Sequence, residues 1–280
     1  MVAPSTSYSK NSGCAQLRVE SVADASAVTA AFATSPMKLL TPRSRGTSVW
    51  AFTSSFGGGL VAGDQTELDL EIATGARCFV GTQSSTKIYR NPAALPCGHQ
   101  TTAELGDASL LVFAPDPVQA FAGSAYTQRQ EFRLTPSANL VLLDWFTAGR
   151  TARGERWAFN HFQSRNDVFV DGRRGFVDSL LLEPESGLIA GSHRLGRFNC
   201  VAMLLFLGST VEAAANRALE DIASREVVQN APSIASASRV ASGAVIRLAG
   251  ESTEAVGREL HYILQPLVAL LGDDPWARKW

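Results

Sequence analysis

The sequence predicts a mainly β protein of stacked coils or layered sheets, with two helices near its C-terminal end. Residues 66–72 alternate between apolar and acidic side chains, which is the pattern of a strand with one buried face. Short strands separated by turn residues continue from about residue 17 to residue 207. A strand–turn–strand unit also recurs, with turn alanines at Ala76, Ala108 and Ala138. Such a near-constant repeat is typical of β units that bury their apolar faces only against neighbouring units.

The individual strands are expected where short apolar runs meet Gly, Pro, Asn, Asp or Ser. After residues 66–72, strands are predicted at residues 77–82, 110–113, 127–134, 140–145, 166–170, 176–182 and 244–248. The longest apolar run, residues 200–207, is far shorter than the roughly 20 residues that cross a bilayer. No membrane-spanning segment is therefore expected.

Two amphipathic segments near the end of the chain predict the helices. Ser209 stands three residues before Glu212, which is the spacing of a capping box, and apolar residues then recur at helical spacing up to Ile222. The second helix is expected to begin near Ser252. Pro266 should kink this helix or cut it short.

Composition excludes several functional classes. The formal net charge is −1, from 25 basic and 26 acidic residues spread along the chain, so no nucleic-acid stripe or polybasic membrane patch is indicated. Charged residues make up only 18% of the chain, which favours a partly apolar surface that contacts partners. The first 13 residues have no apolar core of a secretory signal. The sequence thus predicts a cytoplasmic protein.

Metal-ligating side chains are scattered along the sequence. The cysteines show no CxxC spacing and the histidines no HExxH spacing, so neither a structural zinc site nor a tight histidine site is expected. These residues are Cys14, Cys78, Cys97, Cys200, His99, His161, His193 and His261.

The densest glycine segment is GGGLVAGD at residues 57–64. A phosphate-binding loop would need Lys followed by Ser or Thr after its last glycine, whereas here Asp64 would repel phosphate. Two interpretations stay open. The glycines satisfy a positive φ or a close backbone approach, or Asp64 is a functional carboxylate.

Two further segments are candidate sites. Residues 82–90, TQSSTKIYR, begin with five uncharged polar side chains, which line a wet cavity or an interface, or decorate an exposed strand. Residues 149–155, GRTARGE, contain Arg150, Arg153 and the single acid Glu155. Arginine clusters of this kind usually form solvated faces or pair with carboxylates. No GxSxG element indicates a nucleophilic triad.

Taken together and in this order, the motifs resemble the urease accessory protein family UreD, also called UreH. The resemblance runs from about residue 14 to residue 280. Its matching segments are SPMKLLTP at 35–42, GGGLVAGD at 57–64, TQSSTKIYR at 82–90, APDP at 114–117, QRQEF at 128–132 and GRTARGE at 149–155.

The resemblance implies a fold and a function. The fold is a β-helix-like stack of many short strands with two helices in the C-terminal third, in a single domain over residues 1–280. We also expect about the first 13 residues of this domain to be disordered. The function is a non-enzymatic one: with the helical partner UreF and the GTPase UreG, the protein delivers Ni²⁺ into apo-urease. It implies no nucleic-acid or membrane partner and no tightly bound cofactor, only transient Ni²⁺.

A nickel chaperone must hold its ion weakly, because Ni²⁺ binds imidazole and thiolate tightly. We therefore expect a wet passage lined by hydroxyls, amides and a few carboxylates. Transient nickel contacts are predicted at Asp64, Asp144 and Glu155. The residues predicted for the passage or for partner contact are Asp64, Thr82, Gln83, Ser84, Thr86, Lys87, Asp144, Arg150 and Glu155.

Two rival functions remain. One is a stacked-β carbohydrate-active enzyme that uses Asp64 and Glu155 as paired carboxylates. Such enzymes usually expose aromatic platforms for sugar, whereas aromatic residues are only 8% of this chain. The other is a scaffold without any metal role.

Overall fold

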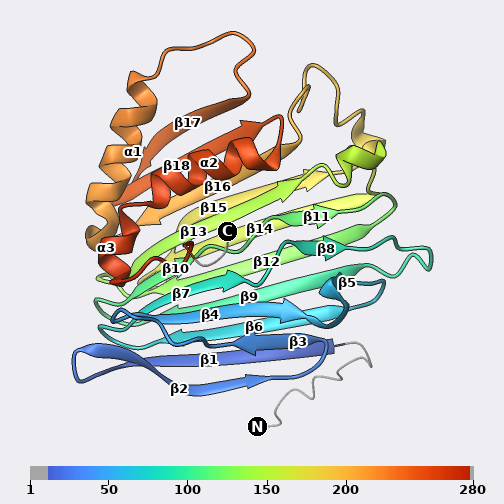
Figure 1. Ribbon diagram of the computed structural model, residues 1–280. Helices are drawn as coiled ribbons and strands as arrows, with labels where there is room; N and C mark the ends of the chain where they lie inside the picture. Colours follow the sequence, from blue (N-terminus) through green and yellow to red (C-terminus); the bar gives the residue numbers. More distant parts are fainter. Residues whose placement is uncertain (1–11, 278–280) are drawn as a thin grey trace.

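The chain folds into a β-solenoid of about four coils, in which two sheets stack face to face (Figure 1). The computed structural model describes residues 12–277. The mainly β, β-helix-like prediction is thus confirmed. Of the segment predicted to be disordered, residues 1–11 lie outside the described residues, and Ser12 and Gly13 begin the first strand.

The first sheet has seven strands, and its five central strands run parallel to one another. The two outer strands, β2 and β15, pair antiparallel with their neighbours. In spatial order the sheet contains β15 (Arg173–Leu182), β14 (His161–Val170), β12 (Ala125–Leu134), β9 (Cys97–Leu105), β6 (Gln65–Ile72), β1 (Ser12–Val22) and β2 (Ala25–Ala33).

The second sheet has eleven strands. Its main path contains β17 (Ser233–Val240), β18 (Gly243–Gly250), β16 (Cys200–Leu207), β13 (Asn139–Thr147), β10 (Leu110–Phe113), β7 (Arg77–Thr82), β4 (Val49–Ser55) and β3 (Met37–Leu40). Three short strands branch from it: β5 (Gly59–Leu60), β8 (Thr86–Ile88) and β11 (Val118–Ala120).

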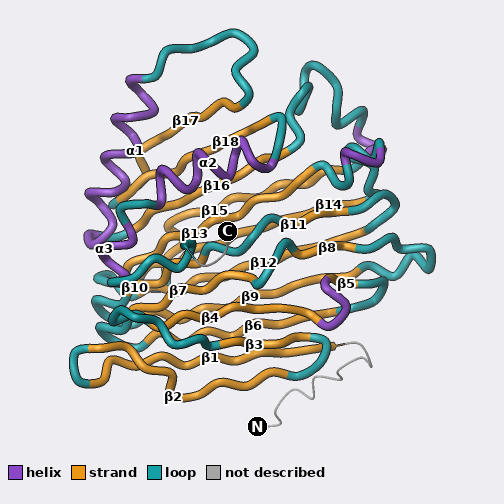
Figure 2. Tube along the Cα trace, in the orientation of Figure 1, coloured by secondary structure: helices purple, strands orange, loops and turns teal. Residues whose placement is uncertain are grey.

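Each coil passes from the seven-stranded sheet through a tight turn into the eleven-stranded sheet. The turns β6–β7, β9–β10 and β12–β13 stack at one end of the solenoid, where the tube in Figure 2 changes repeatedly from strand to loop. The register pairs Leu110 with both Arg77 and Asn139, so Ser109, rather than the predicted Ala108, is the equivalent of Ala76 and Ala138. The predicted repeat is real but one residue out of phase in its middle copy.

Apolar side chains form three buried clusters. Alternate residues of the eleven-stranded sheet point outward against the helices, as Leu204 and Phe206 do. The others point inward and meet the seven-stranded sheet near the stacked turns, as Leu205 does with Phe132 and its neighbours. A third cluster, around Tyr126 and Phe162, fills the opposite end of the space between the sheets.

The helices cover the outer face of the eleven-stranded sheet at its C-terminal end (Figure 1). They are α1 (Glu212–Ser224), α2 (Thr253–Leu264) and α3 (Leu267–Leu271). As predicted, Ser252 caps α2, and the helix ends before Pro266, which leaves α3 as a separate short piece. The predicted capping box is wrong, because Ser209–Val211 forms a 3₁₀ turn and α1 begins at Glu212 without a side-chain cap.

Within residues 12–277, no helix combines the length and the apolar character that crossing a membrane requires. The longest apolar run of the sequence is instead β16, a strand buried between the helix cluster on one face and the inward cluster on the other.

Candidate functional site

The register of the seven-stranded sheet stacks polar residues inside the solenoid. Thr66 pairs with His99, His99 with Gln128, and Gln128 with Ser164 on four neighbouring strands. Two residues further along the same strands, Thr101 pairs with Gln130 and Gln130 with Asn166. Because residues i and i+2 of a strand share a face, all of these side chains point the same way. We name this set the polar band: Thr66, His99, Thr101, Gln128, Gln130, Ser164 and Asn166.

Apolar rows border the polar band on both sides. The next row toward the stacked turns belongs to the inward apolar cluster, and the row on the other side belongs to the third cluster. The members of these two rows are Leu70, Ala103, Phe132 and Val168, and then Cys97, Tyr126 and Phe162. The band is therefore a polar layer between two apolar cores.

A cavity of about 80 Å³ lies between the sheets along this band. A water molecule needs only about 10–15 Å³ of such volume and a few polar partners, so the cavity has room for several waters. Hydroxyl groups from β4, the 82–86 segment and β8 line it opposite Thr66, His99, Gln128 and Gln130. The lining includes the exposed residues Gly58 and Ser84, where the cavity meets the surface.

Asp144 on β13 is the carboxylate of the opposite sheet that faces the band. It accepts hydrogen bonds from Gln128 Nε2 at 3.1 Å, Ser164 Oγ at 2.5 Å and Asn166 Nδ2 at 2.8 Å. Burial raises the pKa of Asp144, while these three hydrogen bonds to the carboxylate act in the opposite direction. Burial therefore disfavours the ionised form of Asp144, whereas the hydrogen bonds from the polar band favour it.

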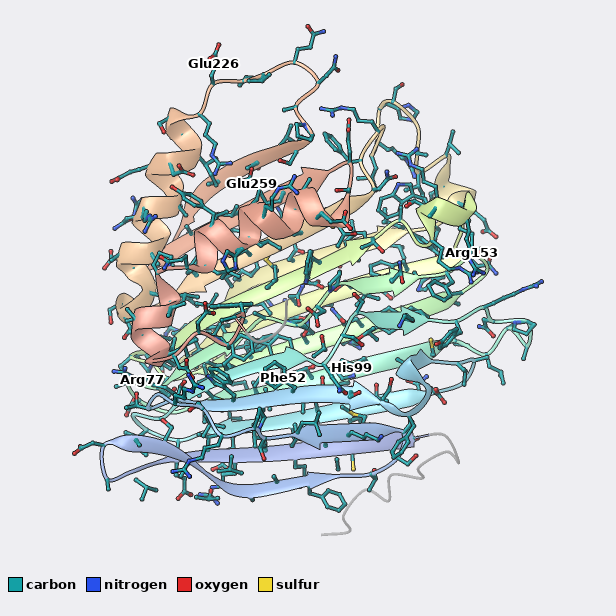
Figure 3. The ribbon with its side chains drawn as sticks, in the orientation of Figure 1. Phe52, Arg77, His99, Arg153, Glu226 and Glu259 are labelled. Carbon is teal, nitrogen blue, oxygen red and sulfur yellow. The ribbon has the colours of Figure 1, made fainter. Side chains whose placement is uncertain are left out.

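His99 is the imidazole that lines the cavity, and it was not among the site residues predicted from the sequence. The side chain, labelled in Figure 3, contacts Thr66 Oγ1 through Nδ1 at 2.8 Å and Thr101 Oγ1 through Nε2 at 3.1 Å. Burial lowers the pKa of His99 to about 4, so the imidazole is neutral at neutral pH. His99 lies one coil after Thr66 and one coil before Gln128, and this coil-to-coil alignment of polar residues could have identified it as part of the site.

The predicted segment 82–87 only partly faces the cavity. Thr82, Ser84 and Thr86 line it, and Thr82 Oγ1 donates to Asp116 Oδ2 at 3.1 Å and accepts from the Asp116 amide at 2.7 Å. Gln83 instead borders a groove on the outer face of the sheet, beside Trp50 and Phe52. Lys87 lies in β8 and is not among the residues that line the cavity.

The glycine segment 57–64 has the structural role that the sequence suggested. Gly57 and Gly58 have φ of +80° and +69°, and a Cβ on Gly59 would lie 2.3 Å from the Lys87 carbonyl oxygen. Both a positive φ and a close backbone approach are thus confirmed. Asp64 closes the following turn by accepting the Val61 amide at 2.9 Å, and it does not line the cavity.

Arg150 and Glu155 form a local ion pair. Arg150 Nε donates to Glu155 Oε2 at 2.9 Å, its second nitrogen donates to Oε1, and the Ala122 amide donates to Oε2 at 3.2 Å. The hydrogen bond from Arg150 lowers the pKa of Glu155. The guanidinium also lies 4.3 Å from the centre of the Phe121 ring. Neither charged residue lines the cavity.

Of the three acids predicted for nickel contact, only Asp144 lies at the cavity, while Asp64 and Glu155 are engaged by the backbone and by Arg150. Within the described part of the chain, no group of three or more His, Cys, Asp or Glu residues is arranged to hold a metal ion. Four of the predicted residues, Thr82, Ser84, Thr86 and Asp144, are brought together at the cavity.

The fold and the cavity define a β-solenoid protein whose interior carries a polar layer between two apolar cores, with helices over one end. The model of the family described as UreD urease accessory protein matches residues 11–280. This chain belongs to that family, as its motifs had indicated.

Relatives from distant organisms show the same relationship. The urease accessory protein UreD of Sorangium cellulosum is 42% identical over 96% of this chain and 84% of its own length. Urease accessory protein D of Arabidopsis thaliana is 34% identical over 92% of this chain and 98% of its own length. The Oryza sativa subsp. indica protein of that name is 32% identical, over 93% and 94%.

Proposed function

We propose that this chain is a non-catalytic nickel-delivery chaperone of the cytoplasm, which binds apo-urease and acts with UreF and UreG to insert Ni²⁺ into the urease active site. The observation that carries the proposal is the polar band. A stability-driven interior would fill these rows with apolar side chains, yet seven polar residues occupy them, and four of these, together with Asp144, border a cavity large enough for water.

The chemistry of the cavity suits a moving cation. Hydroxyls, amides and water are weak ligands for Ni²⁺, whereas several imidazoles or thiolates would hold the ion tightly. The cavity offers one neutral imidazole, from His99, and the carboxylates of Asp144 and Asp116, the latter hydrogen-bonded to Thr82. An ion can thus move from one weak ligand to the next without reaching a site that binds it tightly.

The paired-carboxylate enzyme has less support. A glycosidase needs two carboxyl groups on either side of one bond, one of them available as an acid. Asp64 is used in a turn, and Arg150 lowers the pKa of Glu155, which opposes a role as proton donor at neutral pH. A scaffold without a metal role would explain the apolar cores but gives no reason for the polar band.

The test compares one substitution on the two faces of the same sheet. Gln128→Leu introduces an apolar side chain into the cavity, whereas Gln100→Leu places it on the exposed outer face of neighbouring β9. Apo-urease is incubated with UreF, UreG, GTP, limiting Ni²⁺ and either variant, and urease activity and bound nickel are measured. Copurification with UreF and circular dichroism confirm that both variants are folded.

We expect Gln128→Leu to reduce nickel incorporation at least about tenfold, which corresponds to about 1.4 kcal/mol in the limiting step. Gln100→Leu should activate urease like the unsubstituted protein. Equal activation by both variants, with both complexes intact, would leave the cavity without a role in delivery and would favour the scaffold.

A further inference from the structure

The polar band continues beyond the cavity onto the edge strand of the seven-stranded sheet. Asn166 on β14 pairs in register with Asp178 on β15. The side chain of Asp178 faces inward, like Phe176 and Leu180 two residues to either side, and is 13% exposed. Asp178 is near enough to Asp144 for its charge to contribute to the raised pKa of that acid. A second carboxylate therefore stands at the outer end of the band.

Arg247 on β18 meets Asp178 from the opposite sheet. Its Nη2 donates to Asp178 Oδ1 at 2.6 Å. Ile246 and Leu248, on either side of it, point into the helix cluster, so Arg247 points to the inner face. The register runs from Asp144 through Met203 to Arg247, which places the guanidinium in the same row as the cavity acid.

This ion pair lies between the buried end of the band and solvent. The Arg247 side chain is 55% exposed, whereas Asp178 is mostly covered and Asn166 is fully buried. Phe176 packs with the inward apolar cluster and Leu180 with the third cluster, so apolar side chains flank the pair on both sides. The polar route at this edge of the solenoid therefore passes through Asp178 and Arg247.

We propose that the cavity has a second mouth between β15 and β18, opposite the mouth at Ser84, and that the Asp178–Arg247 pair is its gate. While the pair is closed, the arginine charge repels a divalent cation and its side chain covers the acid. When the pair opens, the Asp178 carboxylate becomes a cation ligand that leads to Asn166 and Asp144. That the cation is Ni²⁺ rests on the proposed function, whereas the gate itself does not.

The test measures access to the band with thiol reagents and needs neither nickel nor partners. Ser164→Cys places a reporter beside Asp144, and Asn166→Cys is the second reporter if the first disturbs folding. Labelling rates by a cationic and an anionic methanethiosulfonate of similar size are followed by peptide mass spectrometry, which separates the reporter from the four native cysteines. Each reporter is combined with Arg247→Ala, with Arg247→Ala plus Asp178→Asn, or with Arg239→Ala.

Arg239 is the matched control, because it is an exposed arginine on neighbouring β17 that binds Asn216 instead of the band. We expect Arg247→Ala to speed cationic labelling by about tenfold, since the freed Asp178 carboxylate attracts the reagent. The double variant should label faster with both reagents but lose the preference for the cation. Arg239→Ala should label like the unsubstituted background.

Labelling that is no faster with Arg247→Ala than with Arg239→Ala would overturn the gate, even if Gln128→Leu still blocks nickel delivery. Conversely, faster labelling together with normal nickel delivery by Gln128→Leu would retain the gate and remove the proposed function. The two proposals can therefore fail separately.

Discussion

Neighbouring rows on the same strands of the solenoid differ in chemistry: one row forms a polar network and the next forms an apolar core. On β12, Gln130 and Phe132 are two residues apart, face the same way and are 3% and 0% exposed. Gln130 donates to Asn166 at 2.7 Å, whereas Phe132 packs edge to face on Phe113 with ring centres 5.6 Å apart. The comparison shows that a solenoid can confine polar function to single rows, because the register repeats each row from coil to coil.

The two kinds of row stabilise the fold differently. Each side chain that an apolar row removes from water adds to the free energy of unfolding. In a buried polar row, hydrogen bonds within the protein only offset the cost of removing the polar groups from water. The polar band meets this condition, since each of its seven residues has a side-chain hydrogen bond. Although these residues are deeply buried, the band should thus contribute less to the free energy of unfolding than an apolar row does.

The largest expected effect separates the two rows directly. Phe132→Ala removes a fully buried ring and should lower the free energy of unfolding by about 3–5 kcal/mol. Gln130→Ala should cost about 1–3 kcal/mol, because it leaves the Asn166 oxygen without its donor unless cavity water replaces it. Urea unfolding followed by tryptophan fluorescence measures both. A cost for Gln130→Ala as large as that for Phe132→Ala would mean that the band is itself a structural core.

The second effect is acid sensitivity, which should originate in the polar row. The pKa of His99 is about 4 in the folded chain and about 6.5 in an unfolded one. The unfolded state therefore binds the proton more readily, and stability is retained above about pH 6.5 and lost as the pH falls toward 4.

We expect this loss to be on the order of 2 kcal/mol, because cavity water softens the burial of the ring. His99→Gln keeps hydrogen bonding but does not titrate, so its free energy of unfolding should fall less than that of the unsubstituted protein between pH 6.5 and 4. Parallel pH curves for the two proteins would exclude His99 as the source.

A third, smaller effect should raise stability. Because burial raises the folded-state pKa of Asp144, its ionised form costs free energy at pH values above that pKa, and the cost disappears as the pH falls toward the unfolded value of about 3.9. Asp144→Asn should therefore be as stable as the unsubstituted protein, or more stable by about 1 kcal/mol, at neutral pH, with a smaller difference in acid.

The same variant should activate urease poorly at limiting nickel, because it removes the carboxylate that is hydrogen-bonded to the polar band. Higher stability with lower delivery would identify Asp144 as a residue kept for function. Strong destabilisation of the variant at neutral pH would instead show that Asp144 and its three hydrogen bonds stabilise the fold.

Several strands were predicted from the sequence with nearly their observed bounds. The strand at residues 77–82 and that at 110–113 have the predicted bounds, and β6 begins one residue early. By contrast, β9 was missed, because Gly98, His99 and Thr101 interrupt the apolar alternation that marks a strand. The polar residues that line the cavity thus hid β9, although β6 and β12, which also carry cavity residues, were predicted.

The candidate site was predicted in part for the same reason. Thr82, Ser84 and Thr86 stood out as a polar run, but His99 and Gln130 gain their meaning only from residues one coil away. Spacing along the chain could not reveal that Asp144 faces Gln128 from the opposite sheet. Whether Asp64, Gln83, Lys87, Arg150 and Glu155 contact nickel or partners stays a prediction.

The smallest expected effect concerns Glu155, which lies outside the polar band. Glu155→Gln keeps an oxygen for the Ala122 amide and for Arg150 but removes the negative charge. Since Arg150 lowers the folded-state pKa of Glu155, the pair contributes stability above the ordinary glutamate pKa that is lost as the pH falls through the lowered one. The loss at neutral pH should be slight, because the Arg150 side chain is 35% exposed and water screens the pair.

Because Glu155 does not line the cavity, we expect the variant to deliver nickel normally at limiting Ni²⁺, in contrast to Asp144→Asn measured beside it. A fall in urease activation with unchanged stability would extend the nickel route from the cavity to the Arg150–Glu155 pair, as the GRTARGE motif first suggested. A large loss of stability would instead show that this pair anchors the loop after β13. The molecule would then contain a polar contact outside the band that is kept for stability and not for delivery.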